Sequence, residues 1–116
     1  MNARKFVRSF GYAIEGIVAA LKEQNLRFHV LAALVVFGAS IWTGISITEW
    51  CIVILVVFGM FTVELLNTAI ERVVDLASPD IHPLAKAAKD IAAGAVLVFS
   101  VASVIIGILI FLPKWL

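Results

Sequence analysis

The chain has 116 residues, enough for one domain, and 63% of them are hydrophobic while only 15% are charged. A mean hydropathy of +1.10 excludes an ordinary soluble domain, which needs more polar side chains to cover its surface. The net charge of +1 gives no case for a nucleic-acid partner. The single cysteine, Cys51, cannot form an internal disulfide, and its apolar neighbours predict a packed thiol. Lipid is therefore the solvent that this composition favours.

The N-terminal residues 4–22 have the pattern of an amphipathic helix on a membrane surface. Phe6, Phe10, Ile14 and Ile17 recur at helical spacing, and charged side chains fall largely on other faces. The alternative is a soluble helix packed on a protein core, but the rest of the chain offers no such core.

Three apolar segments follow, each close to the about 20 residues that cross a bilayer core. They predict transmembrane helices at 28–47, 50–77 and 86–112, so the expected class is an all-α integral membrane protein. Short polar connectors around "GISITE" and "DLASPDIHPLAK" separate them. Pro79 and Pro83 predict that the second connector is locally non-helical.

Basic residues are distributed asymmetrically about these segments. Five precede the first span, none lies in the first connector, three flank the second connector, and Lys114 alone lies near the C-terminus. The positive-inside rule then predicts a cytoplasmic N-terminus and a cytoplasmic second connector. Trp42, Trp50 and Trp115 would all lie at the outer interface, where tryptophan is enriched.

The stretch "VELLNTAIERVVD", residues 63–75, places carboxylates at the end of the second apolar segment. Relative to Glu64, a helix puts Asn67, Thr68, Glu71 and Asp75 at about −60°, +40°, −20° and +20°. These residues form one polar stripe, which should face other helices or a wet cleft, because facing lipid is costly.

Depth distinguishes the carboxylates of this stripe. Measured from Trp50, Glu64 lies about 21 Å inward and Glu71 about 32 Å inward, across a hydrocarbon core about 30 Å thick. Glu71 and Asp75 would meet water, metal and soluble substrates. Glu64 would meet only molecules that reach into the lipid, where it is suited to act as a general base.

Two further clusters fall at the cytoplasmic boundary, "EQNLRFH" (23–29) and "AKAAKDIAAGAVL" (85–97). Glu23 and Arg27 share one side of a helix, Lys89 can neutralise a phosphate, and Glu23 with Glu71 can hold Mg²⁺ through oxygen ligands. A boundary salt bridge between Lys89 and Asp90 is the structural alternative. His29 has the character of an ordinary interfacial histidine.

No Walker A loop, soluble-kinase motif, Ser-His-Asp set or CxxC pair is present. Instead the pair of motifs "VELLNTAIERVVD" and "AKAAKDIAAGAVL", with looser matches in "GYAIEG" and "EQNLRFH", resembles the small integral-membrane lipid kinases of bacteria, the diacylglycerol kinase/undecaprenol kinase family. The resemblance covers almost the whole chain. It implies a homotrimer of three-span subunits with N-terminal surface helices, in the bacterial cell membrane with the active site cytoplasmic.

The resemblance also implies an activity: transfer of the γ-phosphate of MgATP to a membrane lipid alcohol. By position in the motifs, Glu64 matches the catalytic base, Asn67 a supporting asparagine, and Glu23 with Glu71 the metal-binding glutamates. The positions that match nucleotide contacts are Tyr12, Glu23, Glu71, Asp80, Ile81, His82, Lys89 and Asp90. Supporting roles fall to Arg27, Asp75 and the basic N-terminus, where Lys5 replaces an expected arginine and Arg8 or Arg4 is the substitute.

The lipid substrate is predicted from resemblance alone. "NLRFH" and Ala92, Ala93 and Gly94 are more similar to the Gram-positive undecaprenol kinases than to the enterobacterial diacylglycerol kinases. Undecaprenol is therefore expected, and diacylglycerol is the alternative. A small proton-coupled transporter subunit, with Glu64 as its buried proton carrier, is the alternative from another class.

Overall fold

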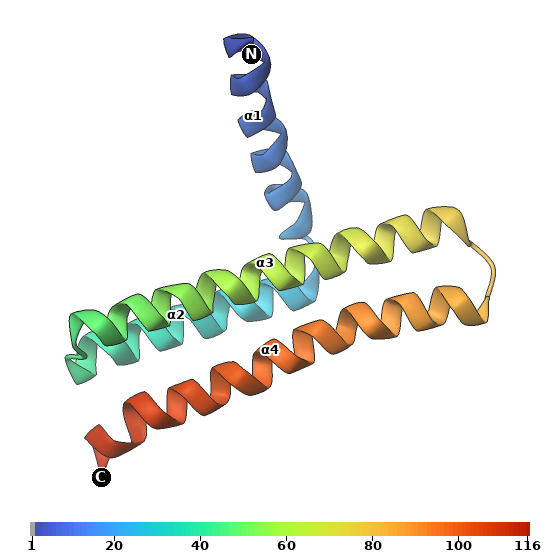
Figure 1. Cartoon of the computed structure of the whole chain (residues 1–116). Helices are drawn as coiled ribbons and strands as arrows, with labels where there is room; N and C mark the ends of the chain where they lie inside the picture. The colour runs from blue at the N-terminus through green and yellow to red at the C-terminus, as the bar shows by residue number, and fades with distance from the viewer. Residues whose placement is uncertain (1) are drawn as a thin grey trace.

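A computed structural model describes residues 2–116 as four helices, shown in Figure 1. They are α1 (Ala3–Ala20), α2 (Gln24–Thr43), α3 (Ile47–Ala77) and α4 (Pro83–Trp115). No strand occurs within residues 2–116. The expected all-α class is confirmed.

Helices α2, α3 and α4 are each long and apolar enough to cross a membrane. With 31 and 33 residues, α3 and α4 are about 46 Å and about 50 Å long, which exceeds a hydrocarbon core of about 30 Å. Few of their apolar side chains are buried within the chain. Cys51 is also exposed, so the predicted packed thiol is wrong. Such an apolar exterior is compatible with a lipid surround and not with water.

The helix ends differ from the sequence-predicted limits because hydrogen-bonding caps, and not the apolar segments, determine them. Gly44, with a left-handed φ of 73°, ends α2 at Thr43. Ser46 and Glu49 form a capping box that starts α3 at Ile47, three residues before the predicted 50. Pro83 is inside the first turn of α4, where its missing N–H breaks no bond, so the non-helical connector is 78–82. The predicted end of α3 at residue 77 agrees with the structure, and the other limits shift by one to four residues.

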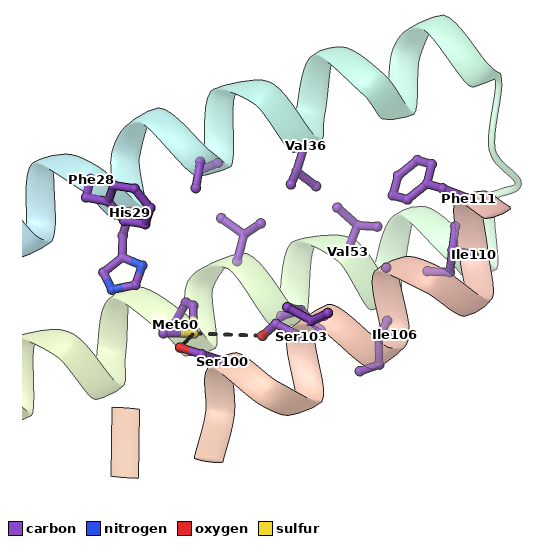
Figure 2. A pocket seen from close by; sticks show the side chains of 16 residues that line it. Phe28, His29, Val36, Val53, Met60, Ser100, Ser103, Ile106, Ile110 and Phe111 are labelled. Carbon is purple, nitrogen blue, oxygen red and sulfur yellow. Dashed lines mark hydrogen bonds between the residues drawn. The ribbon is translucent and has the colours of Figure 1, made fainter. Parts of the chain in front are cut away.

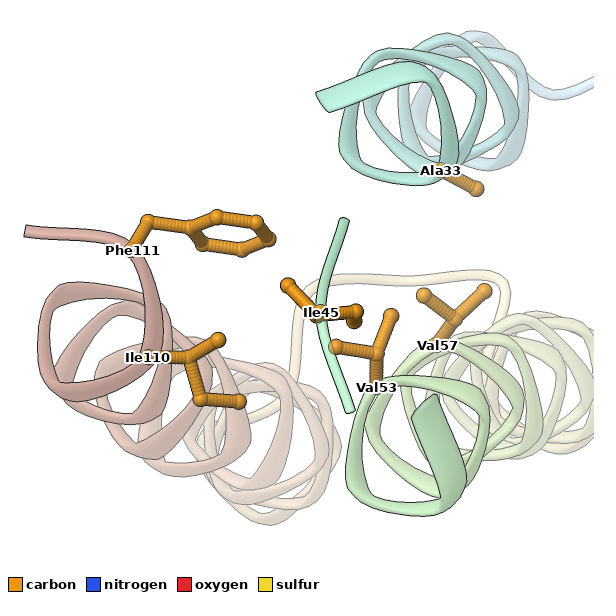
Figure 3. Packing of buried hydrophobic residues seen from close by; sticks show 6 residues of the cluster. All are labelled: Ala33, Ile45, Val53, Val57, Ile110 and Phe111. Carbon is orange, nitrogen blue, oxygen red and sulfur yellow. The ribbon is translucent and has the colours of Figure 1, made fainter. Parts of the chain in front are cut away.

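Helices α3 and α4 run antiparallel as a long hairpin, with α2 beside α3, while α1 projects steeply away from all three (Figure 1). A small apolar core joins α2, α3 and α4 near the α2–α3 connector; Figure 3 shows its members, Ala33, Ile45, Val53, Val57, Ile110 and Phe111. Further along the hairpin, the Phe99 ring occupies the space that a Cβ on Gly59 would need. Gly59 therefore permits the close approach of α3 and α4.

The three tryptophans lie at one end of the bundle. Trp42 and Trp115 have ring centroids 6.3 Å apart, and Trp50 stacks on Phe37 at 6.2 Å. Trp115 Nε1 donates a 2.9 Å hydrogen bond to Thr43 Oγ1. At the opposite end, α3 and α4 extend beyond the start of α2 (Figure 1). The end of α3 and the start of α4 carry the ion pairs Asp75–Lys89 and Lys86–Asp90, and this part is called the charged end of the bundle.

Candidate active site

The predicted polar stripe of α3 faces the other helices. Glu64, Asn67 and Thr68 expose only 2%, 5% and 6% of their surface, Glu71 is half-buried, and Asp75 is exposed. The stripe thus runs from the interior of the bundle to its charged end. A buried carboxylate in a membrane-spanning helix requires a polar partner.

His29 of α2 is the partner that the structure gives Glu64. Its Nε2 lies 3.6 Å from Glu64 Oε2, and the two side chains are 15% and 3% exposed. Sequence reasoning treated His29 as an ordinary interfacial histidine and missed this pair. Its position within an otherwise charge-free apolar segment was the available signal, because a polar group there needs a partner on another helix.

Asn67 and Glu71 are joined one turn further toward the charged end. Asn67 Nδ2 donates a 3.1 Å hydrogen bond to Glu71 Oε1, which holds the Glu71 carboxylate in one orientation. Asn67 Oδ1 is buried and has no hydrogen-bond partner within residues 2–116. A carboxylate oriented by an amide donor is a type of oxygen ligand that suits a hard cation such as Mg²⁺.

Ion pairs surround the charged end. Arg72 Nη2 lies 3.3 Å from Glu23 Oε1, and Lys89 of α4 pairs with Asp75 of α3. The predicted alternative, a salt bridge between Lys89 and Asp90, is not the arrangement found. Neighbouring helical residues point about 100° apart, and Asp90 instead pairs with Lys86 at 2.6 Å. These pairs are largely exposed and stabilise the fold little, which leaves their charges available to a ligand.

The remaining sequence-predicted residues lie on three other elements, which are α1, the α3–α4 connector and α2. Tyr12, Lys5 and Arg8 lie on the exposed face of α1, and no hydrogen bond or ion pair in the described chain joins their side chains to α3. Asp80, Ile81 and His82 lie in the exposed α3–α4 connector, where His82 caps α4 by accepting from Leu84 N. Arg27 is exposed on α2. Among residues 2–116, no three His, Cys, Asp or Glu side chains gather as a metal site, so the metal assignment of Glu23 and Glu71 stays a prediction.

An apolar pocket of about 380 Å³ lies between α2, α3 and α4. Figure 2 shows His29 at one end and Phe111 at the other. Ser100 and Ser103 line the middle, and both hydroxyls lie 3.8 Å from Met60 Sδ. They also donate to carbonyl oxygens of their own helix, those of Val96 and Phe99. The pocket is therefore an apolar space suited to hydrocarbon, and one end of it is lined by His29 of the buried His29–Glu64 pair.

Three membrane-spanning helices, a buried carboxylate in contact with a histidine that lines an apolar pocket, and a charged rim define a multi-pass membrane protein with an enzyme-like site. A family model for prokaryotic diacylglycerol kinase matches residues 11–111. An undecaprenol kinase of Bacillus subtilis is 55% identical over 111 residues, covering 95% of this chain and 90% of that protein. A diacylglycerol kinase of Synechocystis is 40% identical over 93% of this chain and 63% of its own, and one of Escherichia coli K12 is 31% identical over 87% and 84%.

The chain belongs to the prokaryotic diacylglycerol kinase family. It is a membrane-embedded lipid kinase, an enzyme that uses ATP to phosphorylate a lipid alcohol. Membership of a lipid-kinase family removes the support for a transporter subunit. The predicted resemblance is confirmed.

Proposed function

We propose that the protein transfers the γ-phosphate of MgATP to undecaprenol, giving undecaprenyl phosphate and ADP. The observation that carries this proposal is the row of Glu64, Asn67 and Glu71 on α3. It runs from Glu64, which contacts the pocket residue His29, to the charged end of the bundle. A lipid hydroxyl would reach Glu64 from the side of the pocket, and a soluble nucleotide would reach Glu71 from the charged end.

Glu64 acts as the general base in this proposal. Its carboxylate accepts the proton of the lipid hydroxyl, and the oxygen attacks the γ-phosphorus. The bond from that phosphorus to the β,γ-bridging oxygen breaks, and ADP leaves with the electron pair. Phosphoryl transfer depends mainly on positioning and charge neutralisation, and a general base adds about 10²–10⁴-fold.

Glu23 and Glu71 would hold Mg²⁺ together with the phosphates of ATP. Mg²⁺ is commonly bound by one or two carboxylates plus substrate phosphates, and the Asn67 amide already orients the Glu71 carboxylate. Bound there, the ion neutralises charge on the transferring phosphate. The side chain of Glu23 is 48% exposed, so its exchange of Arg72 for a ligand requires little rearrangement.

The nucleotide would occupy the charged rim. Lys89 lies beside Asp75 there and can neutralise a phosphate. The other proposed contacts are Tyr12, Asp80, Ile81, His82 and Asp90, with Arg8 or Lys5 from the N-terminal helix and Arg27 in a supporting role. Because α1 and the α3–α4 connector are exposed within one chain, a homotrimer that shares sites between subunits would bring these residues together.

The proposed placement is the bacterial cell membrane with the charged end in the cytoplasm. The asymmetry of lysine and arginine supports this orientation, as does the tryptophan cluster at the opposite end. Helix α1 leaves the bundle steeply (Figure 1), the direction expected of a helix that lies along the membrane surface.

Two observations favour undecaprenol over diacylglycerol. Identity is 55% to the undecaprenol kinase and 31–40% to the diacylglycerol kinases of Synechocystis and Escherichia coli. The pocket hydroxyls of Ser100 and Ser103 are already bonded to backbone carbonyls. They would offer no free donor to the ester carbonyls of diacylglycerol, and a buried unpaired acceptor is costly, whereas a prenyl tail has none.

The test is phosphoryl transfer by the purified protein in detergent micelles, with radiolabelled MgATP and either undecaprenol or diacylglycerol at matched mole fractions. Labelled undecaprenyl phosphate, formed with the higher kcat/KM, is the expected product. A higher kcat/KM for diacylglycerol would select the alternative substrate. Labelled lipid from neither alcohol would contradict the proposed function.

A further inference from the structure

The contact between His29 and Glu64 lies where the apolar pocket ends. His29 is one of the sixteen lining residues, and its imidazole points from α2 toward α3 in Figure 2. Phe28 packs edge-on against the ring at 5.9 Å. Glu64 is the one carboxylate within ion-pair range of His29 in residues 2–116. An alcohol whose tail fills the pocket would thus bring its oxygen to His29, which lines the pocket, and to Glu64, which lies against His29.

The distance between the His29 imidazole and the Glu64 carboxylate leaves room for a hydroxyl that bonds to both. At 3.6 Å from Nε2 to Oε2, the pair is too far apart for a direct hydrogen bond. A hydroxyl oxygen can lie at about 2.8 Å from both atoms, with an angle of roughly 80° between them at the oxygen. That oxygen would accept from Nε2–H through a lone pair and donate its own hydrogen to Oε2.

We propose that His29 is a substrate-contacting residue that binds the lipid hydroxyl through Nε2–H while Glu64 accepts the hydroxyl proton. This inference rests on the proposed function and adds a second contact to the same oxygen. His29 keeps its own proton, and its hydrogen bond fixes the oxygen lone pair that is not used for attack. The pair thereby orients a primary alcohol attached to a long apolar tail.

The burial of His29 favours a polar role for its imidazole over a role in packing alone. An apolar ring would pack against Phe28 and the pocket wall without the free-energy cost of desolvating two polar nitrogens. The 3.6 Å gap also leaves the Glu64 carboxylate without a hydrogen bond from His29. A substrate hydroxyl closes that gap, and catalytic hydrogen bonds are often long before substrate binds.

The test compares the wild type with His29→Phe, His29→Gln and His29→Asn, varying undecaprenol in micelles at saturating MgATP. Phenylalanine keeps the ring and removes the donor. Glutamine places an amide N–H near the reach of Nε2, whereas asparagine is shorter. We expect the KM for undecaprenol to rise about tenfold in His29→Phe and His29→Asn and to return to within about threefold of wild type in His29→Gln. The KM for ATP should stay at the wild-type value.

Two controls separate this role from a structural one. Leu31→Phe adds a ring to an exposed position on α2 near the same depth, and trimer content is measured on every sample. A fall in kcat with an unchanged KM for undecaprenol is the pattern of a residue that only positions Glu64, and it would overturn the proposal. If His29→Phe fails to assemble, equal KM values in His29→Gln and His29→Asn would overturn it instead.

Failure of the proposed function is distinguishable in the same experiment. Glu64→Gln tests the general base through kcat. If Glu64→Gln retains the wild-type kcat while His29→Phe raises the KM for undecaprenol, Glu64 is not the general base and His29 still contacts the substrate. If the wild type phosphorylates neither alcohol, equilibrium binding of labelled undecaprenol replaces the kinetic assay. Binding about tenfold weaker in His29→Phe than in Leu31→Phe supports the proposal, and equal binding overturns it.

Discussion

Asn67 donates a 3.1 Å hydrogen bond from its side-chain amide to the Glu71 carboxylate one turn further along α3. Glu71 is half-buried and Asn67 is buried, so this contact fixes one carboxylate oxygen and leaves the other free. Groups that orient a metal-binding carboxylate commonly change metal affinity or activity 10–100-fold when removed. The Asn67 amide is therefore a support for the proposed Mg²⁺ site.

Asn67→Ala should weaken the apparent Mg²⁺ affinity by about 10–100-fold and lower lipid phosphorylation at limiting Mg²⁺. Titration of kcat/KM with Mg²⁺ at fixed ATP measures the effect. Thr62→Val, which removes an exposed hydroxyl bonded to its own helix at Phe58, is the matched control on α3. An Mg²⁺ titration that superimposes on the wild-type curve would remove Asn67 from this supporting role.

Glu71→Gln and Glu23→Gln should each require more Mg²⁺ for half-maximal activity and should lower turnover severely. Each substitution removes one anionic oxygen ligand while it preserves side-chain size. Removal of divalent cations with a chelator should abolish wild-type transfer, and added Mg²⁺ should restore it. Glu15→Gln, on the exposed face of α1, is the comparison for loss of a surface carboxylate. Unchanged apparent Mg²⁺ affinity in both variants would exclude the two glutamates as ligands.

The polar stripe was predictable because it depends on one helix alone. The period of 3.6 residues fixes the relative directions of Glu64, Asn67 and Glu71, and lipid on the outside fixes which way the stripe turns. The His29–Glu64 pair was not predictable in this way. It joins α2 to α3, so it depends on the rotation of two helices about their axes, which neither segment's periodicity encodes.

The helix ends show the same difference between local features, which the sequence specifies, and contacts between helices, which it does not. Apolar segments mark the thickness of the hydrocarbon, whereas backbone caps determine where a helix stops. Gly44 in a left-handed conformation and the Ser46–Glu49 capping box determine the α2–α3 turn, and both are local signals present in "GISITE". The pairing of Lys89 with Asp75 required the α3–α4 hairpin register, which the sequence does not specify directly.

Gly59→Leu should destabilise the α3–α4 hairpin, because the Phe99 ring occupies the position of the new side chain. Overpacking of this kind typically costs about 1–3 kcal/mol. Thermal unfolding in micelles, followed by circular dichroism, measures the change. The double variant Gly59→Leu/Phe99→Ala should recover part of the loss, since it removes the ring that clashes. Gly38→Leu is the control, because no atom lies within 4 Å of a Cβ at that position.

Topology is tested by single-cysteine labelling in a Cys51→Ala background. A cysteine at Thr48, an exposed residue at the start of α3, should react with an impermeant maleimide added outside intact cells. A cysteine at Asp80, in the exposed α3–α4 connector, should react only after the membrane is permeabilised. The reverse pattern would contradict a cytoplasmic active site.

Glu64→Gln tests the residue on which the proposed chemistry depends. Glutamine preserves size and removes the base, so the variant should bind MgATP, assemble, and lose about 10²–10⁴-fold in lipid phosphorylation. Stability should change little or improve, because a carboxylate that is 2% exposed in a membrane-spanning helix is costly to bury. A carboxylate that only joins helices through His29 predicts the opposite, lost assembly with normal chemistry in the remaining folded protein. Trimer content and lipid phosphorylation are therefore measured on one purified sample, and a well-assembled variant with near-normal turnover would rule out Glu64 as the general base.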